Sequence, residues 1–121
     1  MVGDNSSESP DNQELDDIPL SLDAILDILA NPRRRALLEY LWEQPGNVGT
    51  VEEATRHILL KESRKVGEQP SHDAIQSSLL HHQLPKMADS GLVEYDVRNQ
   101  TIRYHENKRL ETAYERVQDL D

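Results

Sequence analysis

One predicted helix, beginning at Ser71, carries most of the side chains in this chain that could recognise a partner through hydrogen bonds. Its polar positions combine serine, glutamine and histidine. Glutamine can bind an adenine edge through two hydrogen bonds, and serine accepts several base edges. These side chains suit base contacts in a DNA major groove, although a merely solvated helix face would have the same composition. The candidate base contacts are Ser71, His72, Gln76, Ser77 and His81.

Basic residues that could hold the phosphate backbone follow this polar face. Lys86 lies near the end of the same helix, and Arg98 and Arg103 lie in a predicted hairpin beyond it. Such residues supply phosphate contacts in DNA-binding proteins, but a solvated hairpin carries the same types. A further cluster, Arg33–Arg35, spans most of a helix circumference, so its members cannot all face one partner. One or two of them could contact phosphate, but we favour a structural role, in which they pair with carboxylates such as Glu39 or Glu43.

The histidines do not have the spacing of a metal site. His81 and His82 are neighbours, and successive helical residues point about 100° apart, which does not suit chelation. The chain has no cysteine, which excludes thiolate ligands, disulfides and thiol catalysis. It has no glycine-rich phosphate loop, nucleophile elbow or paired-carboxylate motif. We therefore expect no metal, no cofactor and no enzymatic activity.

The helix that positions the polar side chains has one apolar side. Pro70 and Ser71 predict a loop that ends in an N-cap. Pro85 should kink the helix, or end it and restart it near Leu84, because proline removes a backbone hydrogen bond. Gly91 predicts a left-handed stop, with the next residue folding back onto the last turn. The residues expected on the buried side are Ile75, Leu79, Leu80, Leu84, Met87 and Ala88.

The apolar period changes from helical to alternating after Gly91. One alternating run spans 93–97, a second spans 101–104, and residues 98–100 form a turn between them. The residues expected inward are Val93, Tyr95, Val97, Ile102 and Tyr104. A helix stopped by glycine and followed directly by a hairpin is the second half of a winged helix-turn-helix.

Two helices are expected at the start of the domain. Ser21 caps the first, and Asn31 followed by Pro32 predicts a break and a restart. The second helix should run to about Glu43. The first helix has one apolar stripe, formed by Leu22, Ile25, Leu26 and Leu29.

A third helix precedes the one that begins at Ser71. Thr50 and Glu53 predict a capping box at its start, and it should run to about Ser63. Val48, just before it, is expected to add a short strand to the hairpin. The polar stretch 64–70 then predicts a loop longer than the turn usual in helix-turn-helix motifs.

The two ends of the chain differ in character. Residues 1–18 are rich in Asp, Glu, Ser and Asn and predict a disordered acidic tail. The winged-helix domain then covers 19–105, and 106–121 forms a C-terminal helix capped by Asn107. Its stripe consists of Leu110, Ala113, Tyr114 and Val117. This stripe either packs on the domain or pairs with a second copy, and we expect a homodimer through it, with or without the first helix.

The chain is strongly acidic, with a formal net charge of −10. Residues 1–20 contribute −6 of this, which leaves −4 for the remainder. Arginine outnumbers lysine by nine to four, and phenylalanine is absent. This composition favours a protein of a very salty cytoplasm, where the Debye length shrinks to roughly 3 Å or less. No apolar run reaches membrane-spanning length, and the N-terminus does not have the pattern of a signal peptide.

Two segments resemble known proteins. Residues 29–38, LANPRRRALL, are similar to the segment that opens the second helix in ArsR-type and related archaeal regulators. Residues 81–96, HHQLPKMADSGLVEYD, resemble a haloarchaeal winged-helix family catalogued as a domain of unknown function. Its pattern is H-x-H-L-P-K-L, then a glycine and V-x-Y-D; here Gln83 stands at the second histidine and Met87 at the last leucine. The resemblance covers roughly residues 22–104 and implies a winged helix-turn-helix.

We therefore expect a mainly α fold with a small β-wing, a winged helix-turn-helix. The expected function is a DNA-binding transcriptional regulator of a halophilic archaeon, with its recognition helix in the major groove and its wing on the backbone. It would act on double-stranded DNA in the cytoplasm, as a homodimer and without membrane contact. The alternative is a winged-helix protein-interaction module without DNA binding, because the acidic surface gives little grip on phosphate.

Overall fold

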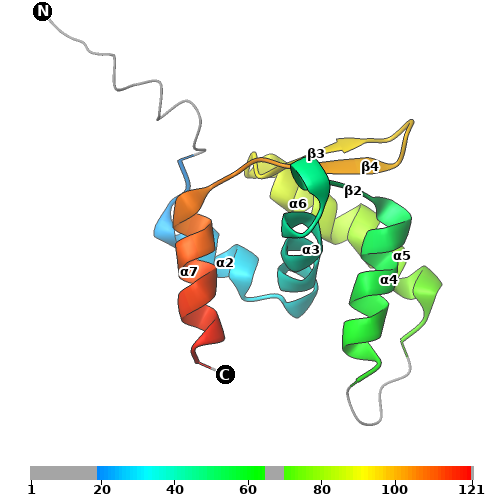
Figure 1. Ribbon diagram of the computed structural model, residues 1–121, viewed down its shortest axis with the longest axis horizontal. Helices are drawn as coiled ribbons and strands as arrows, with labels where there is room; N and C mark the ends of the chain where they lie inside the picture. Colours follow the sequence, from blue (N-terminus) through cyan, green and yellow to red (C-terminus); the bar gives the residue numbers. More distant parts are fainter. Residues whose placement is uncertain (1–18, 65–69, 121) are drawn as a thin grey trace, which may run out of the picture.

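The computed structural model describes residues 19–64 and 70–120, and these form a mainly helical chain with a small antiparallel sheet (Figure 1). The predicted acidic tail, 1–18, and most of the predicted loop, 64–70, lie outside the described residues. The mainly α fold with a small β-wing is confirmed, with its helices and hairpin in the order of a winged helix-turn-helix.

The first two predicted helices, α2 (Leu22–Leu29) and α3 (Pro32–Trp42), begin where expected. The Ser21 hydroxyl accepts a first-turn backbone N–H of α2 at 3.1 Å, and the Asn31 side chain accepts one of α3 at 2.8 Å. Such caps satisfy N–H groups that have no partner within the helix. A short 3₁₀ turn, η2 (Pro45–Asn47), then leads out of α3.

The predicted strand and third helix are β2 (Val48–Thr50) and α4 (Val51–Glu62), but the capping box between them is only half formed. Thr50 Oγ1 accepts the Glu53 N–H at 3.1 Å, as expected. The Glu53 carboxylate does not accept the Thr50 N–H. It accepts the Tyr40 hydroxyl at 2.7 Å, and that hydroxyl accepts the Thr50 N–H at 2.9 Å. Tyr40 therefore joins α3 to the start of α4.

Gly49 lets β2 lie directly against the Tyr40 ring. A Cβ at this position would come within 2.4 Å of that ring, so no larger residue fits without movement. The Tyr40 hydroxyl needs this close approach to reach the backbone of Thr50.

The long helix that begins after Ser71 has three parts: α5 (His72–Ser78), the π-helical turn η3 (Leu79–Gln83) and α6 (Leu84–Asp89). The Leu84 N–H donates to the Leu79 carbonyl, five residues back. This wider turn accommodates Pro85, whose ring would crowd the preceding turn of a regular helix and whose nitrogen donates no hydrogen bond. The predicted restart near Leu84 is confirmed.

Gly91 ends α6 in the left-handed conformation, with φ of +79°. The Leu92 N–H donates to the Met87 carbonyl at 3.0 Å, and Leu92 is fully buried, as the predicted stop requires. The chain then enters the hairpin of β3 (Val93–Asp96) and β4 (Thr101–Tyr104).

The three strands lie in the order β2-β4-β3, with β4 antiparallel to both neighbours. The register places Ile102 between Gly49 and Tyr95, on the face that covers the core. Arg103 lies opposite Glu94 on the outer face. The expectation that Val48 would join the hairpin is confirmed.

The last helix, α7 (Lys108–Gln118), packs on its own domain through its apolar stripe. The Asn107 side chain caps it by accepting the Leu110 N–H at 3.0 Å, and Leu110 is fully buried. Trp42 of α3 meets the Tyr114 ring edge-on, with ring centroids 4.9 Å apart. Of the two predicted roles for this stripe, packing on the domain is the one that the structure shows.

Three helical positions that were expected inward are exposed. On α2, Ile25 and Leu29 are buried, but Leu22 and Leu26 are 60% and 50% exposed. They point away because α2 contacts α3 and α7 and turns Ile25 and Leu29 toward the core. On α6, Ala88 is exposed because the π turn shifts the buried side of the helix.

Candidate nucleic-acid interface

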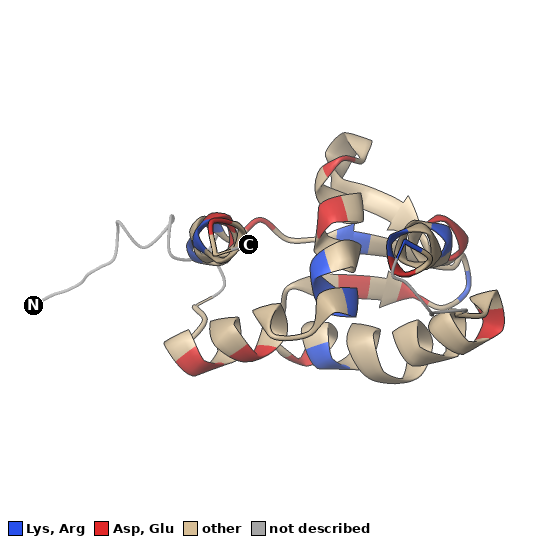
Figure 2. Cartoon of the chain, turned by 90° about the horizontal axis from the view of Figure 1, so that it is seen from below, with Lys and Arg blue, Asp and Glu red and all other residues tan. Residues whose placement is uncertain are grey.

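Helix α4 packs against α5, and α5 continues through η3 into α6 along the lower edge of the view in Figure 2. Residues 74–85 contain no Lys, Arg, Asp or Glu, so the ribbon is uncharged between Asp73 at one end and Lys86 at the other. The exposed side of this helix is therefore the longest uncharged helical surface in the described residues. Its contacts must come from hydrogen bonds and apolar groups.

The first turn of α5 is tied to acidic side chains. The Ser71 hydroxyl accepts the Ala74 N–H at 3.0 Å and so acts as the predicted cap. His72 lies between two carboxylates, with Nδ1 at 3.1 Å from Asp73 and Nε2 at 3.0 Å from Glu52 of α4. Hydrogen bonds to Asp73 and Glu52 raise the pKa of His72 above its ordinary value.

Gln76 is also held by α4. Its Nε2 lies 3.3 Å from Glu52 Oε1 and 3.5 Å from the Thr55 hydroxyl. The hydrogen bond with His72 is the main cause that lowers the pKa of Glu52, which also pairs with Arg56 at 2.9 Å. Two of the five predicted base-contacting residues, His72 and Gln76, thus each have a side-chain nitrogen held by Glu52, a carboxylate that the sequence reasoning did not single out.

Ser77 and His81 are the two predicted base contacts without a side-chain partner among the described residues. Both are exposed, and neither forms a side-chain hydrogen bond or ion pair with another described residue. They lie in the middle of the uncharged stretch, on α5 and η3. These two side chains are free to contact a partner without first breaking an interaction.

Lys86 is paired within the chain. Its ammonium group lies 2.5 Å from the Asp27 carboxylate of α2, and this hydrogen bond lowers the pKa of Asp27. The pair joins α2 to α6. A phosphate contact by Lys86 would therefore have to compete with Asp27.

The wing presents two basic side chains, Arg98 and Arg103. Neither side chain forms an ion pair with another described residue. The turn that carries Arg98 is held by Asp96, whose carboxylate accepts the N–H groups of Arg98 at 3.0 Å and Asn99 at 3.2 Å. Val97, expected inward on the strand, lies in this turn and is 69% exposed, because the strand ends at Asp96.

The basic cluster Arg33–Arg35 has a structural role, as expected, but with other partners than Glu39. Arg33 forms a two-pronged pair with Glu62 of α4, with N–O distances of 2.5 and 2.9 Å. Arg35 donates to the Leu29 carbonyl at the end of α2. The three side chains point in different directions, so Arg33 fixes α3 to α4, whereas Arg34 and Arg35 fix it to α2.

Arg34 connects α2 with the π turn. It is only 8% exposed and donates to the carbonyls of Ile28 at 3.1 Å and Asp27 at 2.7 Å. A third hydrogen bond, at 3.1 Å, reaches Gln83, whose amide donates to Ser78 at 3.0 Å. Burial lowers the pKa of Arg34. Sequence reasoning missed this buried network; its only signal was a glutamine on the apolar side of the helix.

Metal and membrane features can be assessed for the described parts of the chain. Residues 19–64 and 70–120 contain no group of three or more His, Asp or Glu side chains that could hold a metal ion. Within the same ranges, no helix has the length and apolar character that a membrane crossing requires.

Comparison with known proteins gives one match. A family model described as a domain of unknown function (DUF7344) matches residues 26–103, which is more than half of the chain. This region runs from α2 through β4 and contains the α5–α6 helix and the wing. No curated protein and no solved structure matches the chain. The chain therefore belongs to the DUF7344 family, a domain family of unknown function.

Proposed function

We propose that this protein is a DNA-binding transcriptional regulator of a halophilic archaeon, of the winged-helix kind found in ArsR-type regulators. The observation that carries the proposal is the exposed, uncharged helix face over 74–85 together with the basic wing. Among the described residues, Ser77 and His81 on this face have no side-chain partner, and Arg98 and Arg103 on the wing have no ion-pair partner. In this proposal the helix enters the major groove and the wing lies on the phosphate backbone.

The dimensions of the helix suit this role. Twelve residues at 1.5 Å per residue span about 18 Å. At about 3.4 Å per base pair, that length covers roughly five base pairs. Ser77 and His81 are the proposed base contacts, since serine hydroxyls and imidazole nitrogens can both donate and accept hydrogen bonds.

The low positive charge of this face fits a saline cytoplasm. At molar salt the Debye length is about 3 Å, so unpaired lysines and arginines add little long-range attraction there. The same screening weakens the repulsion between carboxylates such as Glu52 and Asp73 and the phosphate backbone. We infer that hydrogen bonds and shape supply most of the affinity of this protein for DNA.

We further propose that the regulator is a homodimer through α2 and α7. A largely apolar groove of about 380 Å³ lies between these helices, beside the exposed Leu22. Lys108 and Arg109 line it on α7, and Asp23 lies outside the lining in the first turn of α2. We expect a twofold pairing of two copies to bring these opposite charges together. This contact would leave α5 and the wing free, because they lie at the other end of the molecule (Figure 1).

Light scattering in molar potassium chloride tests the dimer. Leu22→Glu should halve the measured mass, because it places a charge in the proposed contact. Leu60→Glu is the matched control, since Leu60 is equally exposed but lies on α4. A monomeric wild-type protein, or a dimer unaffected by Leu22→Glu, would contradict this interface.

The second candidate function is a protein-interaction module without DNA affinity. It is favoured by the acidic start of α5, where Glu52 and Asp73 flank His72 and both engage it. Such a surface suits a basic protein partner better than a phosphate backbone.

Selection from a random duplex library at molar potassium chloride separates the two functions. The wild-type protein should enrich a motif with twofold symmetry. The Ser77→Ala/His81→Ala double variant should lose that enrichment, whereas Arg116→Gln on α7 should retain it. Failure of the wild-type protein to enrich any motif would favour the interaction module.

A further inference from the structure

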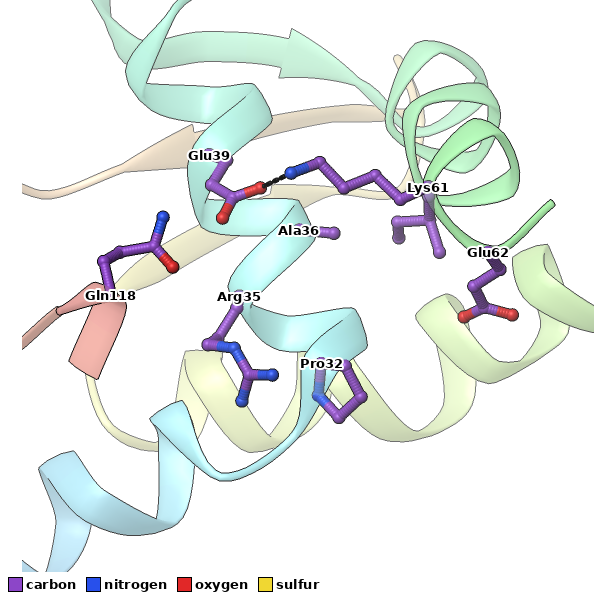
Figure 3. A pocket seen from close by; sticks show the side chains of 8 residues that line it. Pro32, Arg35, Ala36, Glu39, Lys61, Glu62 and Gln118 are labelled. Carbon is purple, nitrogen blue, oxygen red and sulfur yellow. Dashed lines mark ion pairs between the residues drawn. The ribbon is translucent and has the colours of Figure 1, made fainter. Parts of the chain in front are cut away.

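A cavity of about 230 Å³ lies between α3, α4 and the C-terminal end of α7 (Figure 3). Pro32, Ala36 and Ile58 form the apolar part of its lining. Charged side chains surround this part, and Gln118 lies across from Arg35. The described lining residues include none from α5, η3 or α6, so the cavity is separate from the helix proposed to contact DNA.

The two carboxylates of the cavity already have cationic partners. Glu62 receives both prongs of Arg33, a geometry in which the charges of both groups are satisfied. Glu39 forms an ion pair with Lys61 and accepts the Tyr114 hydroxyl. Burial acts to raise the pKa of Glu39, but the bonds from Lys61 and Tyr114 outweigh it and hold that pKa below its ordinary value. Glu39 is thus a carboxylate already bound to Lys61.

Arg35 is the remaining cation of the cavity. Its guanidinium donates to the Leu29 carbonyl and forms no ion pair with any residue in 19–64 or 70–120. A guanidinium has five N–H donors, so several remain beside the cavity. The lining itself is neutral, with Arg35 and Lys61 against Glu39 and Glu62. Because Arg33, from outside the lining, pairs with Glu62, and Lys61 pairs with Glu39, the Arg35 guanidinium is left without a carboxylate partner among the described residues.

We propose that this cavity binds a small organic acid, with the carboxylate on Arg35 and the hydrocarbon part against Ala36 and Ile58. The planar fork of arginine matches the two oxygens of a carboxylate. The volume lies below the roughly 300–1,000 Å³ of drug-sized sites, so the acid carries a short chain or a single ring. Because α4 is the first helix of the helix-turn-helix, the ligand would contact the DNA-binding unit through α4, away from the helix proposed to contact DNA.

Nuclear magnetic resonance titration of the full-length, ¹⁵N-labelled protein tests this site. The probes are potassium benzoate and potassium butyrate, each compared with an equal addition of potassium chloride. At least one acid should produce a saturable shift of the Arg35 Nε–H signal and of the backbone amides of Ala36 and Ile58. Potassium chloride should produce only small, unsaturated shifts spread over the surface.

Variants assign the affinity to the guanidinium. Arg35→Gln should weaken binding on the order of tenfold or more, the loss expected for a charge-assisted hydrogen bond. Arg35→Lys, which keeps the charge but not the fork, should bind with intermediate affinity, and Arg98→Gln on the wing should bind like wild type. No saturable shift in the wild-type protein with either acid, or equal affinity in Arg35→Gln, would overturn the proposal.

Discussion

Replacing Arg98 by glutamine should flatten the salt dependence of DNA binding. The proposed interface has two basic side chains without a carboxylate partner among the described residues, Arg98 and Arg103, because Lys86 is paired with Asp27. Two such basic side chains in each protomer give four phosphate contacts in a dimer. At about 0.9 per neutralised phosphate, the slope of log K against log salt is about −3.6 for wild type and about −1.8 for the variant.

Fluorescence anisotropy with a selected duplex measures this difference directly. A threefold rise in potassium chloride should weaken wild-type binding about 50-fold and variant binding about 7-fold, from those slopes. Arg116→Gln removes the same charge from α7, at the end of the molecule away from the wing, and should keep the wild-type slope (Figure 1).

Equal slopes for Arg98→Gln and wild type would refute the assignment of Arg98 to a phosphate. A wild-type slope as steep as about −9, which ten phosphate contacts would give, would also contradict the reasoning. Such a slope would require more free cations at the interface than the structure leaves, because Arg56 is paired with Glu52 and Lys86 with Asp27.

Three further predictions concern the fold and its titration. Arg34→Met should lower the free energy of unfolding by about 2–3 kcal/mol, because two carbonyls and Gln83 lose a buried partner; a loss under about 0.5 kcal/mol in urea denaturation would argue against this. Gly49→Ala should cost about 1–3 kcal/mol, because its Cβ would meet the Tyr40 ring, and an unchanged melting temperature would contradict that contact. The folded pKa of His72 is raised, so its contribution to stability is present below the unfolded pKa and is lost as the pH rises through the folded pKa. A proton titration by nuclear magnetic resonance should show a lower pKa for His72 in Glu52→Gln, and an equal pKa would exclude Glu52 as its partner.

The boundaries of the helices and strands were largely predictable because they depend on local chemistry. Ser21, Asn31 and Asn107 cap helices with their own side chains, and Gly91 adopts the left-handed conformation that ends α6. Pro85 likewise marked the division of the long helix, since it cannot donate the hydrogen bond that a continuous helix needs.

The direction of side chains was less predictable, because it depends on which neighbour each helix meets. Leu22 and Leu26 fit a helical stripe, but α7 and α3 contact another side of α2. The π turn adds a residue to one turn, so it buries Gln83 and exposes Ala88. A periodicity that assumes a regular helix cannot anticipate either result.

Charge pairing across the fold was the least predictable part of the candidate site. His72 and Gln76 suit base contacts by residue type, but Glu52, which precedes them by 20 and 24 residues, binds both. Lys86 is similarly paired with Asp27. These partners come from separate helices, and only packing brings them within reach of each other.

Chromatin immunoprecipitation of the tagged protein in a halophilic host tests the proposed function most directly, because it measures DNA occupancy at native salt. The proposal predicts sharp peaks that share a twofold symmetric motif, are lost in Ser77→Ala/His81→Ala and are retained in Arg116→Gln. No enrichment above an untagged control would contradict DNA binding and favour the protein-interaction module.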